Sequence, residues 1–293
     1  MKRLTVMGTF VADLTFRAPE LPRWGQTLIG SSFSLGPGGK GSNQAVAAAR
    51  LGATVSFIGK VGRDTFGDLA RDTWKKEGID TQLVFETTEQ ATGAASVVVH
   101  ETKGENAIVV VPGSGFALSI ADVDRARPLI EASSVFMTQL ENTLDVVEHA
   151  LAIAHRAGVP TILNPAPALE LPRSIYPLCD YLTPNEIEAA SLSATEDRNV
   201  IVTLGEKGAL VRTPTVTKHI PAFDAGPVVE TTGAGDAFNG GFAVALMEGL
   251  DVVEATRYGC AVAGISVTRP GTARSMPTRA EVDKIFQLPS RLE

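Results

Sequence analysis

Short apolar segments alternate with amphipathic stretches along most of the chain. Apolar runs at 4–8, 55–58, 135–137, 161–163, 181–183 and 200–204 have the length of buried strands. Helical periodicity covers 42–51, 66–77 and 144–157, and each of these stretches is followed by a glycine that can cap a helix. This alternation predicts an α/β fold, a doubly wound and mostly parallel sheet with helices on both faces. Ligands of such a fold bind at the carboxyl ends of the strands.

Two stretches, 15–35 and 81–111, interrupt the alternation. The second contains the β-rich runs 94–99 and 107–111, with no helical segment between them. We expect a small β-sheet, inserted as a lid into a single catalytic domain that spans 1–293. It could close over a site or form a dimer surface. The C-terminal part, 235–268 and 280–286, is expected to be helical.

A run of small residues, Thr231 to Phe238, contains the most chemical information. Val228 and Val229 before it resemble the end of a strand, and 237–250 has helical spacing. Gly233 and Gly235 would leave backbone N–H groups uncovered at a helix N-terminus, where an anion such as phosphate binds. Asp236 stands directly behind them as a candidate base. Taken alone, the run is also compatible with an ordinary helix start whose Asp interacts with the helix dipole.

A second glycine-rich loop occupies 35–44 and also precedes a helix. Lys40 and Asn43 lie one helical turn apart in it. Its glycines would let the backbone approach a polyol closely, although a plain turn with a helix cap is equally compatible. The loop lacks the spacing of a P-loop.

The composition favours a small-molecule partner. The chain is 44% hydrophobic and 20% charged, with a net charge of −7, which argues against a nucleic-acid surface. It contains no apolar run of membrane-spanning length and no signal-peptide pattern, so we expect a cytoplasmic protein without a membrane partner. Cys179 and Cys260 are expected to be reduced thiols, and the four His residues form no metal-ligand motif.

Together, the two glycine elements resemble the signatures of the ribokinase-like (PfkB) carbohydrate kinases. The resemblance continues in the family's order through 139–141, 164–168, 183–188 and 203–208. It implies nine strands in the large sheet, a small β lid and transfer of the ATP γ-phosphate to a primary sugar hydroxyl. The first candidate is D-ribose, giving ribose 5-phosphate. The resemblance also implies Mg²⁺ and K⁺ as cofactors and a homodimer formed through the lid sheet.

The resemblance also assigns residues. Asp236 would be the base, and Gly233, Ala234 and Gly235 would form the anion hole. The sugar-contacting positions are Val11, Asp13, Gly39, Lys40, Asn43, Glu141 and Asp236. The nucleotide-binding positions are Asn185, Thr203, Gly205, Gly208, Gly233, Gly235 and Cys260. Glu188 would act indirectly on Mg²⁺, and the K⁺ positions are Glu230, Thr232 and Ser275.

The chain departs from the family pattern at four places. Val11 stands where most members have Asn, and members that phosphorylate 2-deoxyribose also have an apolar residue at this position. Glu230 replaces an Asp, Cys260 replaces His or Asn, and the stretch 192–199 is short. The alternatives are therefore a 2-deoxyribokinase, another family kinase acting on a nucleoside, hexose or sugar phosphate, and a catalytically silent sugar-binding regulator. An NAD oxidoreductase is disfavoured because the first strand is not followed by GxGxxG.

Overall fold

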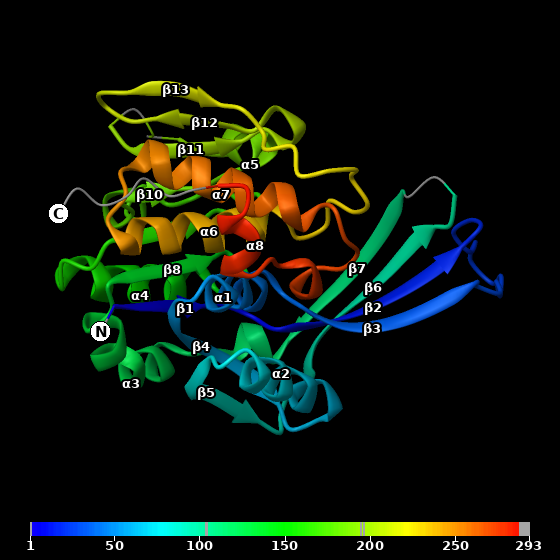
Figure 1. Cartoon of the computed structure of the whole chain (residues 1–293). Helices are drawn as coiled ribbons and strands as arrows, with labels where there is room; N and C mark the ends of the chain where they lie inside the picture. Colours follow the sequence, from blue (N-terminus) through cyan, green and yellow to red (C-terminus); the bar gives the residue numbers. More distant parts are fainter. Residues whose placement is uncertain (1, 103–104, 194, 196, 287–293) are drawn as a thin grey trace.

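The computed structural model describes residues 2–102, 105–193, 195 and 197–286. Its larger sheet has nine strands in the order β13-β12-β11-β10-β9-β8-β1-β4-β5 (Figure 1). All neighbours from β5 to β11 pair in parallel, and only β12 and β13 are antiparallel additions at one edge. The strands are β1 (Arg3–Met7), β4 (Thr54–Gly62), β5 (Asp80–Thr87), β8 (Val135–Gln139), β9 (Thr161–Asn164), β10 (Tyr181–Leu182), β11 (Asn199–Thr203), β12 (Ala209–Arg212) and β13 (Thr217–Ile220). The doubly wound α/β architecture is confirmed.

Helices cover both faces of this sheet. One hydrophobic core lies under α1 (Lys40–Arg50), α2 (Thr65–Lys76), α6 (Ala234–Glu248) and α7 (Val252–Ser266). The other lies under α3 (Ile120–Glu131) and α4 (Leu144–Arg156). Neighbouring residues of a strand belong to different cores, as Val6 and Met7 of β1 do. Two short helices, α5 (Glu186–Ala190) and α8 (Arg279–Asp283), complete the covering layers.

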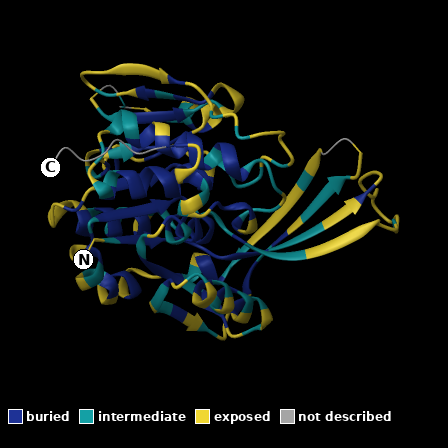
Figure 2. Ribbon diagram, viewed as in Figure 1, coloured by how far each residue is buried: buried dark blue, intermediate teal, exposed yellow. Residues whose placement is uncertain are grey.

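Four strands form the separate small sheet, which we call the lid. Its order is β3-β2-β6-β7, and it projects away from the large sheet (Figure 1). Its strands are β2 (Val11–Ala18), β3 (Ser32–Gly38), β6 (Thr92–His100) and β7 (Asn106–Gly113). The parallel pairing of β2 with β6 joins the two insertions. Much of the lid is exposed, whereas the centre of the large sheet is buried (Figure 2).

The lid boundaries differ from those expected. The stretch 81–111 begins inside β5, which pairs with β4 in the large sheet. Leu83 and Val84 pack against opposite cores there, so this segment is a covered strand of the domain. Two elements were not anticipated, helix α3, which starts with a capping box at Ser119, and the β12–β13 hairpin.

The expectation of a strand end at Val228 and Val229 was wrong. The segment is an exposed loop, held by a hydrogen bond from Val229 N to the carbonyl of Val267. Helix α6 begins at Ala234, one residue before the expected helical stretch from 235, and Gly233 serves as its N-cap in the left-handed conformation. In the described part of the chain, no helix has both the length and the apolarity that a membrane span requires.

Candidate active site

The N-termini of α1 and α6 meet above the carboxyl ends of β1, β8 and β9. Their close approach depends on Gly240 of α6, because a Cβ there would lie 2.5 Å from the Cβ of Ala47 and 2.9 Å from the carbonyl oxygen of Gln44. A larger side chain at this position would separate the helices. The packing thereby brings the first turn of α6, with Asp236, to the polar first turn of α1.

Asp236 is buried, 7% exposed, and each of its carboxylate oxygens accepts one side-chain hydrogen bond. Asn43 Nδ2 donates to Oδ2 over 2.9 Å, and Gln44 Nε2 donates to Oδ1 over 3.0 Å. Burial raises the pKa of the carboxyl above its ordinary value, while the Lys40 ammonium and the two amide donors oppose the rise. A buried carboxylate with few bonding partners can accept a proton from a substrate hydroxyl.

Asn43 also has a spare acceptor. Its Oδ1 is buried and has no hydrogen-bond partner within the described residues. An unpaired buried acceptor costs about 1–3 kcal/mol, and a bound hydroxyl would remove that cost. Asn43 is thus suited to accept from a ligand while it donates to Asp236.

Glu141 ties three segments of the site together. Its Oε2 accepts a 2.5 Å hydrogen bond from the Thr9 hydroxyl and a 3.0 Å bond from the backbone N–H of Lys40. Burial raises the pKa of Glu141. Burial opposes the charge of Lys40, but the carboxylates of Asp236, Glu141 and Glu188 raise the pKa of Lys40 above its ordinary value. Lys40 therefore stays a cation in a largely acidic site.

Asp13 lies on β2 at the base of the lid. Its pKa is raised from 3.8 to about 6, mainly by burial, with further contributions from the charges of Asp236 and Glu230. A hydrogen bond from Thr272 partly offsets this rise. Val11, two residues earlier, is 4% exposed and pairs with Gly38 of β3 and Gly93 of β6.

Gly39 is the bend that joins β3 to α1. Its φ is +87°, and a Cβ there would lie 2.6 Å from Thr9 O and 2.8 Å from Val11 N. A glycine is required at this position, since any side chain would meet the β1–β2 connection. The predicted sugar-contacting residues Val11, Asp13, Gly39, Lys40, Asn43, Glu141 and Asp236 thereby come from neighbouring elements of one region.

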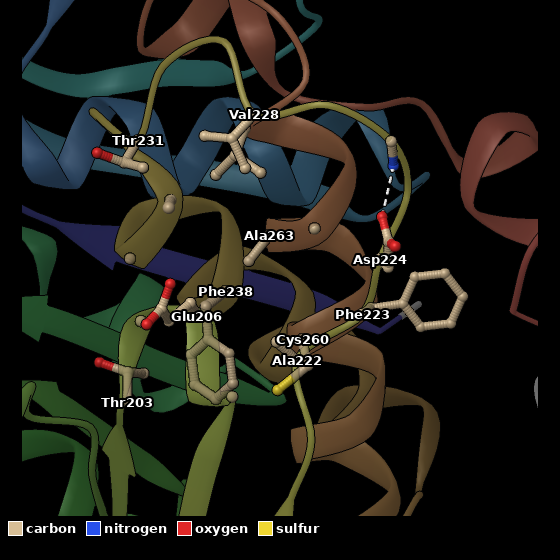
Figure 3. A pocket seen from close by; sticks show the side chains of 17 residues that line it. Thr203, Glu206, Ala222, Phe223, Asp224, Val228, Thr231, Phe238, Cys260 and Ala263 are labelled. Carbon is tan, nitrogen blue, oxygen red and sulfur yellow. Dashed lines mark hydrogen bonds between the residues drawn. The ribbon is translucent and has the colours of Figure 1, made fainter. Parts of the chain in front are cut away.

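A pocket of about 510 Å³ lies beside this region (Figure 3). Thr203 from β11, Phe238 from α6 and Cys260 from α7 line it, together with the loop that follows β13. Its volume is within the range that accommodates cofactors and nucleotides. Of the predicted nucleotide-binding residues, it includes Thr203, Gly205, Gly208, Gly235 and Cys260. Asn185 and Gly233 lie outside its lining.

Two features shape the walls of this pocket. Gly208 has a φ of +92°, and a Cβ there would lie within 2.5 Å of both Ala222 N and the carbonyl carbon of Pro221, so the loop packs closely. Burial raises the pKa of the Cys260 thiol to about 12, which keeps it neutral near pH 7. Cys260 thus presents a small apolar group to whatever occupies the pocket.

Asn185 and Glu188 bond to each other at the start of α5. Asn185 Oδ1 accepts from Glu188 N, and Glu188 Oε2 accepts from Asn185 N, both over 2.8 Å. This capping box explains the Asn-x-x-Glu spacing locally. Glu188 is 8% exposed, and burial raises its pKa. The stretch 192–199, which is short by the family pattern, includes positions 194 and 196, and these two lie outside the described residues.

The predicted K⁺ residues lie on two loops that contact each other. Glu230 Oε2 accepts a hydrogen bond of 3.0 Å from Gly271 N, and Glu230 N donates to Val267 O. Ser275 is buried on the second loop, and its hydroxyl donates to Thr272 O. Thr232 is half-buried directly before the αL residue Gly233. A carboxylate, hydroxyls and loop carbonyls are donors of the kind that bind hard cations.

The sequence reading missed several polar residues behind Asp236. Gln44, Gln139 and Asn164 form a buried hydrogen-bonded chain next to it, and Thr9 holds Glu141. Gln139 and Asn164 belong to stretches that carried the family resemblance, and Gln44 follows Asn43. Their position in or beside the family motifs was the signal by which the sequence could have indicated them.

The comparisons with known proteins agree with this geometry. The profile described as pfkB family carbohydrate kinase matches residues 1–279. The chain is 40% identical to a ribokinase of Haemophilus influenzae, with 96% of this chain and 97% of that protein covered. It is 36% identical to a deoxyribokinase of Salmonella typhi, with 97% and 99% covered.

Solved structures give the same result. A ribokinase of Arabidopsis thaliana complexed with ribose and ATP superposes with a TM-score of 0.91 at 28% identity, covering 99% of this chain and all of that one. The ribokinase of Thermotoga maritima has a TM-score of 0.87 at 34% identity, covering 97% and 99%. The family match, the full-length relatives and the shared fold lead to one conclusion: this chain belongs to the pfkB family of carbohydrate kinases.

Proposed function

We propose that the protein transfers the γ-phosphate of ATP to a primary hydroxyl of a pentose, with D-ribose as the first candidate and ribose 5-phosphate as the product. The observation that carries this proposal is Asp236, a buried carboxylate with one N–H donor on each oxygen, placed at the glycine-led N-terminus of α6. Similarity to ribokinases over nearly the whole chain supports the choice of sugar.

In this proposal the Asp236 carboxylate takes the proton from the attacking sugar hydroxyl. The hydroxyl oxygen then forms a bond to the γ-phosphorus, and the bond from that phosphorus to the bridging oxygen of ADP breaks. The developing negative charge would meet the N–H groups of Gly233 and Gly235 and the positive end of the helix dipole. The N–H of Ala234, expected to belong to the same anion hole, instead donates to the carbonyl of Thr231 over 3.1 Å. A Cβ at Gly235 would have no heavy atom within 4 Å, and Gly235 lines the pocket of about 510 Å³, so this turn borders the space proposed for the nucleotide.

The neighbouring polar residues would hold the sugar. Asp13 and Glu141 supply acceptors, Lys40 a cation, and Asn43 an unpartnered buried oxygen. The about 510 Å³ pocket next to α6 would hold the nucleotide, with Thr203, Gly205 and Gly208 on the side of β11 and Cys260 on the side of α7. Asn185 lies at the start of α5, outside the lining of this pocket, and would contact the nucleotide from its edge.

Mg²⁺ fits the charges of the site. Asp236, Glu141 and Glu188 interact electrostatically with Lys40, and this excess of carboxylates would repel a polyphosphate that arrived without its cation. Mg²⁺, when bound, would neutralise phosphate charge, and Glu188 would influence it indirectly. Glu230, Thr232 and Ser275 would hold K⁺ on the loops that support Gly233.

A 2-deoxypentose is the second candidate substrate. Val11 is buried at the start of β2 and offers no hydrogen bond to a sugar hydroxyl, and a deoxyribokinase is among the full-length relatives. A nucleoside is less well supported. Phe10 is buried edge-to-face against Trp74 and offers no stacking surface, and Phe16, 39% exposed, already contacts the ring of Phe33 on the lid.

We also propose that the lid forms a homodimer interface. Val109 and Val111 of the edge strand β7 are 69% and 61% exposed, and Phe33 of the opposite edge strand is 57% exposed. Apolar edges of this kind favour association. Sedimentation of the wild type and of Val109→Lys would test this, with a monomeric wild type as the contrary result.

A cytoplasmic location stays a prediction.

One experiment tests the activity directly. ADP formation is measured with ribose, 2-deoxyribose, arabinose, xylose, fructose and common nucleosides, with Mg²⁺, and with and without K⁺. The proposal expects a pentose to give the highest kcat/KM. Sugar binding without ADP formation from any acceptor would instead identify a catalytically silent sugar-binding protein, and a nucleoside or hexose as best acceptor would reassign the substrate.

A further inference from the structure

A chain of buried amide side chains lies behind Asp236. Gln139 at the end of β8 donates from Nε2 to Gln44 Oε1 over 2.6 Å. Gln44 Nε2 donates to Asn164 Oδ1 over 3.1 Å and to Asp236 Oδ1 over 3.0 Å. Gln44 and Gln139 are 0% and 1% exposed, and Asn164 is 6% exposed. These residues come from three different elements, so the tertiary fold alone assembles them.

The direction of this chain of hydrogen bonds is fixed at one end. Asn164 Nδ2 donates over 2.8 Å to the backbone carbonyl of Thr183, which can only accept. The Asn164 oxygen therefore points toward Gln44, and Gln44 must present its NH₂ group there. The same NH₂ group faces Asp236. The backbone carbonyl of Thr183 thus orients Asn164, and Asn164 in turn orients Gln44 so that its N–H group donates to Asp236.

Gln44 and Asn43 differ in what they leave available. Gln44 uses both amide hydrogens and its oxygen within the protein, on Asp236, Asn164 and Gln139. Asn43 keeps a buried oxygen without a partner in the described chain. Gln139 Oε1, on the far side of Gln44, is also buried without a partner in the described chain. Of the two amides that contact Asp236, Gln44 is thus fully used within the protein, whereas Asn43 can still accept from a ligand.

We propose that Gln44, oriented by Asn164 and Gln139, is a positioning residue that keeps the Asp236 carboxylate ionised and correctly turned toward the acceptor hydroxyl. This inference rests on the proposed function, in which Asp236 is the base. An N–H donor stabilises a carboxylate over its protonated form, and its direction fixes the plane of the carboxyl group. Gln44 would act through Asp236 without touching either substrate.

Gln44→Met leaves the charged groups around Asp236 unchanged, whereas Gln44→Glu adds a carboxylate to them. These groups are Lys40 on α1, Glu188 on α5, Asp13 on β2 and Glu141 after β8. A change in the pH dependence of Gln44→Met can thus be compared directly with that of the wild type. The acid limb of the kcat profile reports the ionisation of the base in the substrate complex.

The stronger variant is Gln44→Glu, which keeps the shape, replaces the donor by an oxygen facing two acceptors and adds a negative charge beside Asp236; the uncharged Gln44→Met is the decisive one. We expect kcat to fall about tenfold or more, since a shift of about 1 Å in a catalytic group can cost about a hundredfold. The acid limb should move to higher pH by about one unit. KM values for sugar and ATP should stay within about threefold.

Two further variants make the result specific. Gln44→Met keeps the length of the side chain without polar atoms, and it should show the same changes in smaller size. Gln82→Glu makes the same charge change at an exposed position on β5 and should match the wild type. Urea unfolding of each variant identifies a loss of fold. If Gln44→Glu does not fold, Gln44→Met decides.

The outcomes separate this inference from the function on which it rests. Wild-type kcat and pH profile in the folded Gln44 variants, or an effect confined to the KM of the sugar, would overturn the positioning role. If the wild type forms no ADP with any acceptor, or if Asp236→Asn keeps most of its turnover, the proposed function itself fails.

Discussion

The hydroxyl of Thr272 lies 3.1 Å from Asp13 Oδ2 and 2.9 Å from the carbonyl oxygen of Pro37. One hydroxyl hydrogen serves both acceptors, so the Asp13 carboxylate receives only part of a hydrogen bond. Burial and the charges of Asp236 and Glu230 outweigh it and raise the pKa of Asp13 to about 6. Asp13 is therefore a carboxylate that the folded protein ionises reluctantly.

This relationship predicts that Asp13→Asn stabilises the free protein at pH 8. The folded-state pKa of about 6 exceeds the ordinary 3.8, so the folded state binds the proton more tightly than the unfolded state. Ionised Asp13 thus lowers the stability of the wild type above pH 6, and the penalty disappears as the pH falls toward 4. Urea unfolding at pH 8, 6.5, 5 and 4 should show the advantage of the variant shrinking over this window.

Asp72→Asn, the same change at an exposed position on α2, is the control for that series. It should show little difference from the wild type at any pH. A variant Asp13→Asn that is less stable than the wild type at pH 8 would contradict the argument. The same variant should raise the KM for the sugar, because it replaces a charged acceptor with a neutral amide.

Asp236→Asn should lower kcat by about a hundredfold or more, because general-base catalysis contributes about 10²–10⁴-fold. The substitution removes the base and leaves the glycine turn of α6 in place, so the KM for ATP should stay within about threefold. Steady-state kinetics on the best sugar checks both numbers. A variant that keeps more than a tenth of the wild-type turnover would exclude Asp236 from the proton transfer.

Glu230 leads us to predict activation by K⁺ beyond that by Na⁺, on top of an absolute need for Mg²⁺. Its carboxylate already accepts from Gly271 N, which ties the two loops together. We expect a fixed carboxylate with backbone carbonyls to suit the larger, more weakly hydrated ion. Rates are measured in choline buffer at constant ionic strength with added NaCl or KCl. Glu230→Gln should weaken the response to K⁺ while Glu89→Gln, at an exposed site, should not. Equal rates with and without K⁺ in the wild type would refute this.

Val11 leads to a prediction about sugar selectivity. A buried apolar residue gives ribose no hydrogen bond, so ribose and 2-deoxyribose should differ in kcat/KM by less than about tenfold. Val11→Asn should move the ratio toward ribose by about fivefold or more, which corresponds to about 1 kcal/mol. Val11→Thr, which keeps the volume and adds one hydroxyl, should have an intermediate effect. A shift toward 2-deoxyribose in Val11→Asn would show that residue 11 does not contact the 2-position of the sugar.

The alternating strands and helices of the large domain were predictable from the sequence. Strands such as 4–8 and 161–163 are short apolar runs. Helices such as 66–77 have a helical period and a glycine after their last turn. Both kinds of element could therefore be placed within a few residues. The start of α6 was also placed within one residue, because the glycines at 233 and 235 indicate a helix N-terminus. Strand β5 was assigned to the lid because the sequence does not show which of two sheets a strand joins.

The site was predictable in its motifs and not in its contacts. Asn43 and Asp236 are separated by 193 positions, and only the packing of Gly240 against α1 makes them neighbours. Asn185 shows the opposite case, since its cap on α5 follows from local spacing alone. Gln44 carried no signal of its own, because its three partners are distant in sequence.

The parallel pairing of β2 with β6 constrains the order in which this chain folds. Val11 pairs with Gly93, and the chain between them includes α1, β4, α2 and β5 of the large domain. The pairing that joins the two halves of the small sheet is therefore closed across a long loop, which is costly in entropy until the intervening elements have docked. Its exposed strands contribute little apolar burial in return. We therefore expect the lid to be the last part of the monomer to assemble and the first to open, with local unfolding there leaving the α/β core intact.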